Sequence, residues 1–303
     1  MSKFPTGAAT PASIVNALKA IAGNPPKVRA SFARGRCVRG TYAASDRAEE
    51  ITSSQSFARP SRVLARFAAG SNVADKLVLR GFSFRLGGND HRSDVLVQSA
   101  PVHFARTLDQ MLAFLKARTP GPDGKPDMKR IRAFSAANPE TLHQANYIAG
   151  RPLPLGFADT TYWGVHAFPA TNSKGETRFI KFKVVPPGGG VTLAEDKAKA
   201  RSADFLHDDL ESRIASGDVR FNVMALLDRP GDPVMDVTIR WPDEDSREAV
   251  RLGTIVITGI EAHEACDPSI FNPENLAEGI GHPPDEIFAA RRAAYAISLA
   301  KRR

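Results

Sequence analysis

The stretch LVLRGFSFRLGGNDHRSDVLVQS, residues 77–99, decides the fold, because two runs of alternating apolar and polar residues flank a turn-forming segment. The first run spans residues 77–86, the second spans residues 94–99, and GGND at 87–90 supplies the turn. Alternation with a period of two places apolar side chains on one face of a strand. Gly, Asn and Asp favour tight reversals of the chain. The stretch therefore predicts two antiparallel strands joined as a hairpin.

The alternating pattern recurs before and after this hairpin, so the two strands belong to a larger sheet. Turn-forming residues separate the runs, and most connections are short, which favours antiparallel neighbours. Eight strands are predicted in two runs of four, and closing such a sheet removes its exposed edges. We therefore expect an α+β fold, mainly an antiparallel eight-stranded β-barrel with flanking helices. The other predicted strands are RCVRGTYA at 36–43, RVLARFAA at 62–69, TTYWGVHAF at 160–168, TRFIKFKVV at 177–185, VRFNVMALL at 219–227 and RLGTIVITGI at 251–260.

Apolar residues repeating at the helical period predict the flanking helices. Residues 11–22 show this pattern first, and GNPP at 23–26 ends that helix. Further helical stretches are predicted at 107–118, 128–137 and 194–216, of which the last is strongly charged. We expect these helices to pack around the barrel.

The composition limits the classes of function. The chain has 303 residues, a net charge of +8 and a pI of about 9.6, but its basic residues are interspersed with Asp and Glu. No basic run is interleaved with aromatic residues, which favours an ordinary basic surface over a nucleic-acid interface. No apolar stretch approaches the roughly 18 residues that a membrane-spanning helix needs, so no membrane span is predicted.

Cys37 and Cys266 are the two cysteines of the chain, and they are 229 positions apart. Two cysteines cannot make a disulfide framework, and this separation gives no metal-ligand spacing. The N-terminal stretch has an early proline and no unbroken apolar core, so it is a poor signal peptide. We therefore expect a cytoplasmic protein in a reducing compartment.

The C-terminal stretch FAARRAAYAISLAKRR, residues 288–303, places Arg291 four residues before Tyr295, so the two side chains share one face of a helix. Two interpretations are open. Either the tyrosine packs against the domain while the arginines face solvent, or the arginine keeps the phenol ionised so that it binds a metal. EAHEAC at 261–266 also holds metal-binding residue types, but it lacks a second ligand pair at a zinc spacing, which favours a solvated turn.

Four motifs follow one another in an order typical of one family. They are NPPKVRASFARGRCVRGTY at 24–42, VLARFAAG at 63–70, TTYWGVHAF at 160–168 and FNPENLAEGIGHPPDEIFAARRAAY at 271–295. With these motifs the chain resembles the haem catalase superfamily, and most of all its short branch, the catalase-related peroxidases. The resemblance implies a catalase-like haem-binding barrel domain over residues 25–303, with residues 1–24 as an N-terminal helical segment.

The resemblance assigns roles on the proximal side of the haem, where the iron ligand lies. It implies haem b, and it makes Tyr295 the ligand of the iron, because tyrosine is the axial ligand that catalases use. The neighbouring Arg291 and the iron both favour the phenolate. Asp285 and His166 match the family's charge relay that holds this arginine. The residues that match the propionate-binding arginines are Arg29 and Arg66.

The distal side, on the opposite face of the haem, departs from the family pattern. Where the family reads R-x-x-H-A-[KR]-G, residues 29–35 read RASFARG, so Phe32 stands at the position of the catalytic histidine. That histidine takes one peroxide proton and returns a proton to the leaving oxygen, which phenylalanine cannot do. Hydrogen peroxide turnover is therefore expected to be weak. The other changed positions are Ala68 for Ser or Thr, Gln98 for Asn and Met111 for Phe.

These substitutions predict a rebuilt, less polar pocket that keeps Gln98 as a hydrogen-bonding side chain. His103 stands where the family commonly has Phe, and it is a candidate replacement base. In a regular strand its odd separation from Gln98 would turn it away from the haem, as a barrel histidine. Pro101 could break that register and bring His103 to the pocket, so both placements are open.

Together these observations predict a haem-dependent oxidoreductase that acts on a small molecule, with organic hydroperoxides favoured over hydrogen peroxide. It is expected to be either a catalase-like peroxidase or an enzyme that rearranges hydroperoxides. The alternative is a non-enzymatic haem protein, either a gas sensor or a haem carrier. A homo-oligomer is expected from the resemblance, and neither nucleic acid nor a membrane is an expected partner.

Overall fold

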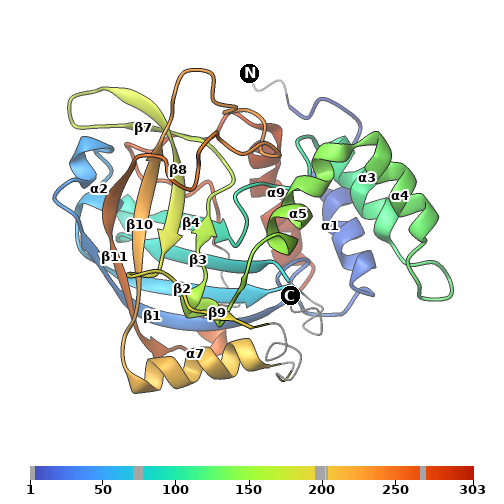
Figure 1. Cartoon of the computed structure of the whole chain (residues 1–303), viewed down its shortest axis with the longest axis horizontal. Coiled ribbons are helices and arrows are strands. Elements are labelled where there is room, and N and C mark those ends of the chain that lie inside the picture. The colour runs from blue at the N-terminus through green and yellow to red at the C-terminus, as the bar shows by residue number, and fades with distance from the viewer. Residues whose placement is uncertain (1–3, 71–77, 195–201, 203, 267–270) are drawn as a thin grey trace.

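The structure is a computed structural model, and it describes residues 4–70, 78–194, 202, 204–266 and 271–303. Its centre is a β-barrel with helices packed around the outside (Figure 1). Eight strands form the ring, all pairings between them are antiparallel, and β8 pairs with β10 to close it. This confirms the predicted barrel. In ring order the strands are β10 (Val219–Leu227), β11 (Ala249–Ile260), β1 (Arg34–Ala44), β2 (Ser61–Ala69), β3 (Arg80–Leu86), β4 (Ser93–Gln98), β6 (Tyr162–Trp163) and β8 (Thr177–Val185).

Shorter strands and the helices surround this ring. β7 (Phe168–Thr171) pairs with the first part of β8, and β5 (Leu153–Pro154) pairs with β9 (Thr192–Leu193) in a separate ribbon. Figure 1 shows α1, α3, α4, α5 and α9 on one side of the barrel and α7 at one end of it. The helices are α1 (Pro11–Ile21), α2 (Gln55–Ala58), α3 (Leu108–Arg118), α4 (Met128–Ala137), α5 (His143–Ala149), α7 (Phe205–Ser216), α8 (His263–Cys266) and α9 (Glu286–Ala300).

Large aromatic side chains fill the inside of the barrel. Phe67, Phe82, Tyr162 and Phe221 come from four different strands, and all four are fully buried. The ring centroids of Phe67 and Phe82 are 4.3 Å apart, and those of Phe82 and Phe221 are 5.2 Å apart. The inside of the barrel is therefore a packed core, and strand alternation turns the residues on either side of these aromatics outward.

The single strand predicted over residues 160–168 is wrong. The chain forms β6 and β7 instead, and residues 164–167 leave the strand between them. His166 lies in this break, where its ring bonds to Asp285. A buried long-range hydrogen bond thus lies in the break within a segment whose composition is typical of a strand.

Two other predicted elements differ in extent. The strand predicted from Leu77 begins at Arg80, and Leu77 itself lies outside the described residues. The charged helix predicted over residues 194–216 is α7, which begins at Phe205, and most of residues 195–203 lie outside the described part of the chain. The helices predicted at 11–22, 107–118 and 128–137 are confirmed as α1, α3 and α4.

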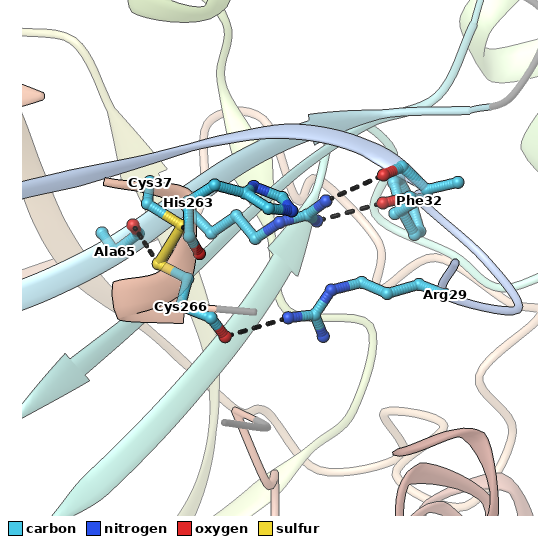
Figure 2. Close-up of a disulfide and its surroundings, with 8 residues drawn as sticks. Arg29, Phe32, Cys37, Ala65, His263 and Cys266 are labelled. Carbon is cyan, nitrogen blue, oxygen red and sulfur yellow. Dashed lines mark hydrogen bonds between the residues drawn. A yellow bond between two sulfur atoms is a disulfide. The ribbon is translucent and has the colours of Figure 1, made fainter. Parts of the chain in front are cut away.

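The expectation about the cysteines is also wrong. The structure joins Cys37 in β1 to Cys266 in α8 by a disulfide, with Cα atoms 5.9 Å apart (Figure 2). Sequence spacing could not show this, because β11 runs beside β1 and returns the chain to its start, with Ile260 opposite Val38. The disulfide removes the reason for expecting a reducing compartment.

Two features, a membrane-spanning helix and a cluster of metal ligands, are absent from the residues that the structure describes. Within them, no helix combines the length and hydropathy that crossing a bilayer requires. Within the same ranges, no three His, Cys, Asp or Glu side chains come together as metal ligands. Residues 263–266 of the EAHEAC stretch form the short helix α8.

Candidate functional site

A cavity of about 300 Å³ lies against the outer face of the barrel. Its barrel wall is made of residues that alternate with core residues along β2 and β3. Arg66 and Ala68 flank the core residue Phe67, and Gly81 precedes the core residue Phe82. The strand period of two thus places the packed core on one side of the sheet and the cavity on the other.

Three helices contribute an apolar wall to the same cavity. α1 contributes Ile14 and Leu18, α3 contributes Leu108 and Met111, and α9 contributes Ile287. Residues three or four positions apart lie on one face of a helix, so α1 and α3 each turn an apolar stripe toward the cavity. Such walls favour a ligand that is mostly apolar.

Four hydrogen-bonded side chains form a chain that ends at the cavity. His166 Nδ1 lies 2.7 Å from Asp285 Oδ2, and Arg291 donates to His166 Nε2 at 3.1 Å. Arg291 also donates to the phenol oxygen of Tyr295 at 2.6 Å. Asp285 is 1% exposed and lies behind the cavity, whereas His166, Arg291 and Tyr295 line it. The structure therefore brings together the four residues that the sequence singled out on the proximal side.

The donor and the acceptor of each of these hydrogen bonds can be assigned. Burial lowers the pKa of His166, which keeps the ring neutral. Arg291 can only donate, so Nε2 of the neutral ring is the acceptor and the ring proton is on Nδ1. The Nδ1–H group donates a hydrogen bond to Asp285. Burial alone raises the pKa of Asp285, but the contacts with His166 and the Phe288 N–H outweigh it and hold that pKa below its ordinary value. The result is a cation that donates to the phenol oxygen of Tyr295 from a fixed position.

Asp285 also begins the helix that carries the tyrosine. It is the N-cap of α9, and its second carboxylate oxygen accepts from the Phe288 N–H at 2.8 Å. One carboxylate therefore starts α9 and orients His166, so the helix and the chain of hydrogen bonds have a common origin.

Two arginines line the cavity, and Figure 2 shows one of them, Arg29, beside the disulfide. Arg29 donates to the carbonyl of Cys266 at 3.1 Å. Arg66, which is 5% exposed, donates to the carbonyls of Phe32 and Ala33 at 3.0 and 3.1 Å. Both guanidinium groups are thus held in place by backbone carbonyls, and guanidinium groups suit carboxylates.

Phe32 has an unusual backbone conformation. Its φ is 51°, in the left-handed region that non-glycine residues adopt rarely. Its ring packs over Gly81, where a Cβ atom would come within 3.1 Å of it. The side chain lines the cavity and presents no polar atom to it.

Gln98 and His103 both line the cavity. β4 ends at Gln98, so the strand alternation that would turn His103 away does not extend to it. His103 Nδ1 lies 2.8 Å from the Ala105 carbonyl and 3.2 Å from the Ala105 N–H, and the shorter contact assigns the proton to Nδ1. With the described residues its Nε2 makes no hydrogen bond. Burial lowers the pKa of His103 to about 4, so the ring is neutral near pH 7 and Nε2 is an acceptor.

Ten of the eleven residues singled out from the sequence line the cavity, and Asp285 lies behind them. The sequence reasoning missed several other lining residues. Ser298 and Arg302 lie three and seven positions after Tyr295, so the helical face could have predicted them. Trp163 is opposite Gln98 in the pairing of β6 with β4, a long-range contact without a local signal.

Comparisons with known proteins agree with this geometry. Residues 25–303 match the Catalase family. The chain is 29% identical to a catalase-related peroxidase of Synechococcus elongatus, over 99% of this chain and 90% of that protein. It is 27% identical to a catalase-related peroxidase of Mycolicibacterium paratuberculosis, over 97% of this chain and 95% of that protein.

Solved structures show the same fold. A fungal catalase superposes with a TM-score of 0.80 at 20% identity, covering 95% of this chain and 62% of that one. Catalase A from Saccharomyces cerevisiae gives a TM-score of 0.80 at 18% identity, covering 95% of this chain and 64% of that one. The chain thus spans less than two thirds of the length of these catalases.

The two catalase-related peroxidases match over nearly their whole length, which separates the short branch from the longer catalases. A haem cofactor is what the family implies. The family match begins at residue 25, within the first of the sequence motifs. It ends at Arg303, three residues after the end of α9. This chain therefore belongs to the catalase family, in the short branch of the catalase-related peroxidases.

Proposed function

We propose that this protein is a haem-dependent oxidoreductase of the peroxidase type, and that it holds haem b in the cavity beside the barrel. One observation carries the proposal. The hydrogen-bonded chain from Asp285 through His166 and Arg291 ends on the Tyr295 phenol oxygen at a largely apolar cavity. A phenol held against a guanidinium is prepared to be a phenolate, which is the form that binds iron.

The residues present fit such a cofactor. Haem b is flat and mostly apolar, and it carries two carboxylates. The apolar side chains of α1, α3 and α9 suit its ring, and Arg29 and Arg66 suit its carboxylates. We therefore assign Tyr295 to the iron and these two arginines to the propionates.

Bound haem supplies the redox centre at which a peroxide O–O bond is cleaved. The chain's own residues decide which peroxides react well. Phe32 can neither accept nor return a proton, and a positioned general base contributes roughly 10²–10⁴-fold to rate. Turnover of hydrogen peroxide is therefore slow in this protein.

The cavity favours an organic hydroperoxide instead. Phe32, Ala68 and Met111 make its lining apolar, so the organic part of such a substrate gains free energy from burial. Gln98 and His103 are polar groups that remain at the cavity for the hydroperoxyl end. His103 is neutral at pH 7, so its Nε2 accepts a hydrogen bond from the substrate.

Steady-state turnover of the purified holoprotein tests this function. We expect kcat/KM for cumene hydroperoxide to exceed that for hydrogen peroxide by about tenfold or more, the discrimination that one or two buried methylenes give. Free haem at equal concentration is the background.

Two other outcomes are informative. Equal turnover of the two peroxides would contradict the substrate preference. Turnover no faster than free haem with either peroxide would assign the chain to the non-enzymatic haem proteins, as a gas sensor or haem carrier.

A further inference from the structure

The segment that carries His103 is not part of the barrel. β4 ends at Gln98, and the next residues leave the sheet and continue to α3. Its backbone groups form hydrogen bonds with residues of other segments. The His103 N–H donates to the Val237 carbonyl at 2.7 Å, and the Val102 carbonyl accepts from Gln98 and Gln144 at 2.9 and 2.8 Å. These bonds place the segment on the wall of the cavity.

A lysine from β8 supplies a further anchor. Lys181 Nζ donates to the Pro101 carbonyl at 3.0 Å and pairs with Glu244 Oε1 at 2.5 Å. Lys181 alternates with the core residues Ile180 and Phe182, so it points outward from the barrel toward this segment. Neither Lys181 nor Glu244 lines the cavity.

The burial of this pair calls for an explanation beyond stability. Lys181 is 2% exposed and Glu244 is 1% exposed. Removing two charges from water costs about as much as their attraction returns, so a buried ion pair is weak evidence for stability. A charged donor does, however, make a short and directional hydrogen bond to a carbonyl. Lys181 donates such a hydrogen bond to the carbonyl of Pro101, two residues before His103.

We infer that Lys181 and Glu244 are a positioning pair, which fixes the Pro101–His103 segment so that the His103 ring stays on the cavity wall. Glu244 holds the ammonium group, and the ammonium group holds the segment. The inference rests on the proposed function for what His103 does to the substrate, but not for the placement of the segment. In this proposal His103 contacts the substrate, whereas Lys181 and Glu244 act only by positioning His103.

A variant without both charges tests the inference. Lys181→Met combined with Glu244→Leu leaves no buried charge unpaired within the pair, and Arg240, which also contacts Glu244, keeps Asp245 as a partner. The matched control is Arg247→Met combined with Asp232→Leu. That pair is equally buried, at 1% and 4% side-chain exposure, and its other hydrogen-bond partners, Leu227, Arg229 and Pro242, lie outside residues 99–103.

Hydrogen–deuterium exchange of the holoprotein gives the first measurement. In the Lys181/Glu244 variant, peptides that cover residues 99–105 should exchange about tenfold faster or more, because the local opening of this segment costs less free energy. In the Arg247/Asp232 control they should exchange as in the wild type. Exchange in the Lys181/Glu244 variant that is no faster than in the control overturns the inference.

Kinetics give the second measurement, with His103→Gln added to each background. If the pair acts through His103, the Lys181/Glu244 variant should lower kcat for cumene hydroperoxide, and adding His103→Gln should cost little more. A full additional loss would overturn the positioning role. If His103→Gln has no effect in the wild type, the proposed role of His103 fails, while the exchange measurement still decides how the segment is held.

Discussion

Phe32 combines a rare backbone conformation with a side chain that has no proton to exchange. Its φ is 51°, its carbonyl accepts from Arg66, and its ring lies over Gly81. Histidine is several-fold enriched among the non-glycine residues that adopt this region. The backbone at position 32 therefore suits a histidine. Position 32 thus offers a place for a side-chain base, which Phe32 does not supply.

Phe32→His should therefore raise kcat/KM for hydrogen peroxide, by roughly 10²-fold or more, because it adds a base at the cavity. Phe32→Leu is the matched control, since it changes the shape without adding a base. Steady-state oxygen evolution or peroxide consumption measures both. If histidine brings no gain over leucine, the absence of a base at position 32 is not what limits turnover of hydrogen peroxide.

His103 predicts a pH dependence of stability. Burial lowers its pKa from the ordinary 6.5 to about 4 in the folded chain. Between these values the unfolded chain binds a proton that the folded chain does not, so the free energy of unfolding falls as pH falls. The loss reaches up to about 3 kcal/mol across that range.

His103→Gln should remove this contribution. Denaturant unfolding at pH 7, 6, 5 and 4 should show a shallower fall of stability for the variant than for the wild type. Parallel curves for the two proteins would show that His103 titrates in the folded chain as it does in the unfolded one, which contradicts the burial argument.

Among the elements, α9 connects the fold to the site most directly. Its N-cap Asp285 accepts from the Phe288 N–H with one oxygen and contacts His166 with the other. Arg291 and Tyr295 then follow on one face of the same helix. The start of the helix thus sets both where the phenol lies and how its guanidinium partner is held.

Asp285→Asn should separate these two tasks. Asparagine is as good an N-cap as aspartate, but it has a single acceptor oxygen for the two N–H groups that the carboxylate serves. We expect haem affinity to fall roughly 10–100-fold, as is usual when the partner of a metal-site residue is lost. Haem titration followed by absorbance measures the affinity, and circular dichroism checks the helix content.

The control is Asp127→Asn, because Asp127 caps α4 by accepting from Lys129 and Arg130 and lies away from the cavity. This variant should bind haem as the wild type does. If the Asp285 and Asp127 variants bind haem equally well, the charge of Asp285 has no part in holding the tyrosine.

The elements also show where sequence reasoning stops. Alternation and helical periodicity are local, so they predicted the long strands and α1, α3 and α4. The break at His166 and the end of β4 at Gln98 depend on partners far along the chain, Asp285 and Trp163. The disulfide was missed for the same reason, because β1 and α8 meet only after the barrel closes.

In the molecule as a whole, the outer face of the barrel forms one wall of the cavity, and the cavity is not inside the barrel. Its inside is packed with aromatic side chains, and the cavity lies outside, between the sheet and α1, α3 and α9. Motif resemblance predicted the cavity residues without any knowledge of where the cavity lies. The side of the sheet follows from the register, in which Arg66 and Ala68 alternate with Phe67. The positions of Gln144 and Trp163 on the cavity wall carry no such pattern in the sequence.

The central claim is that Tyr295 binds the iron of a haem, and the absorption spectrum of Tyr295→Phe tests it most directly. Tyr147→Phe is the control, since Tyr147 packs against Arg151 and Arg240 and does not line the cavity. We predict that the wild type and the Tyr147 variant share the spectrum of ferric haem with a phenolate ligand, and that the Tyr295 variant loses it. A Tyr295→Phe protein that takes up haem with the wild-type spectrum would contradict the account.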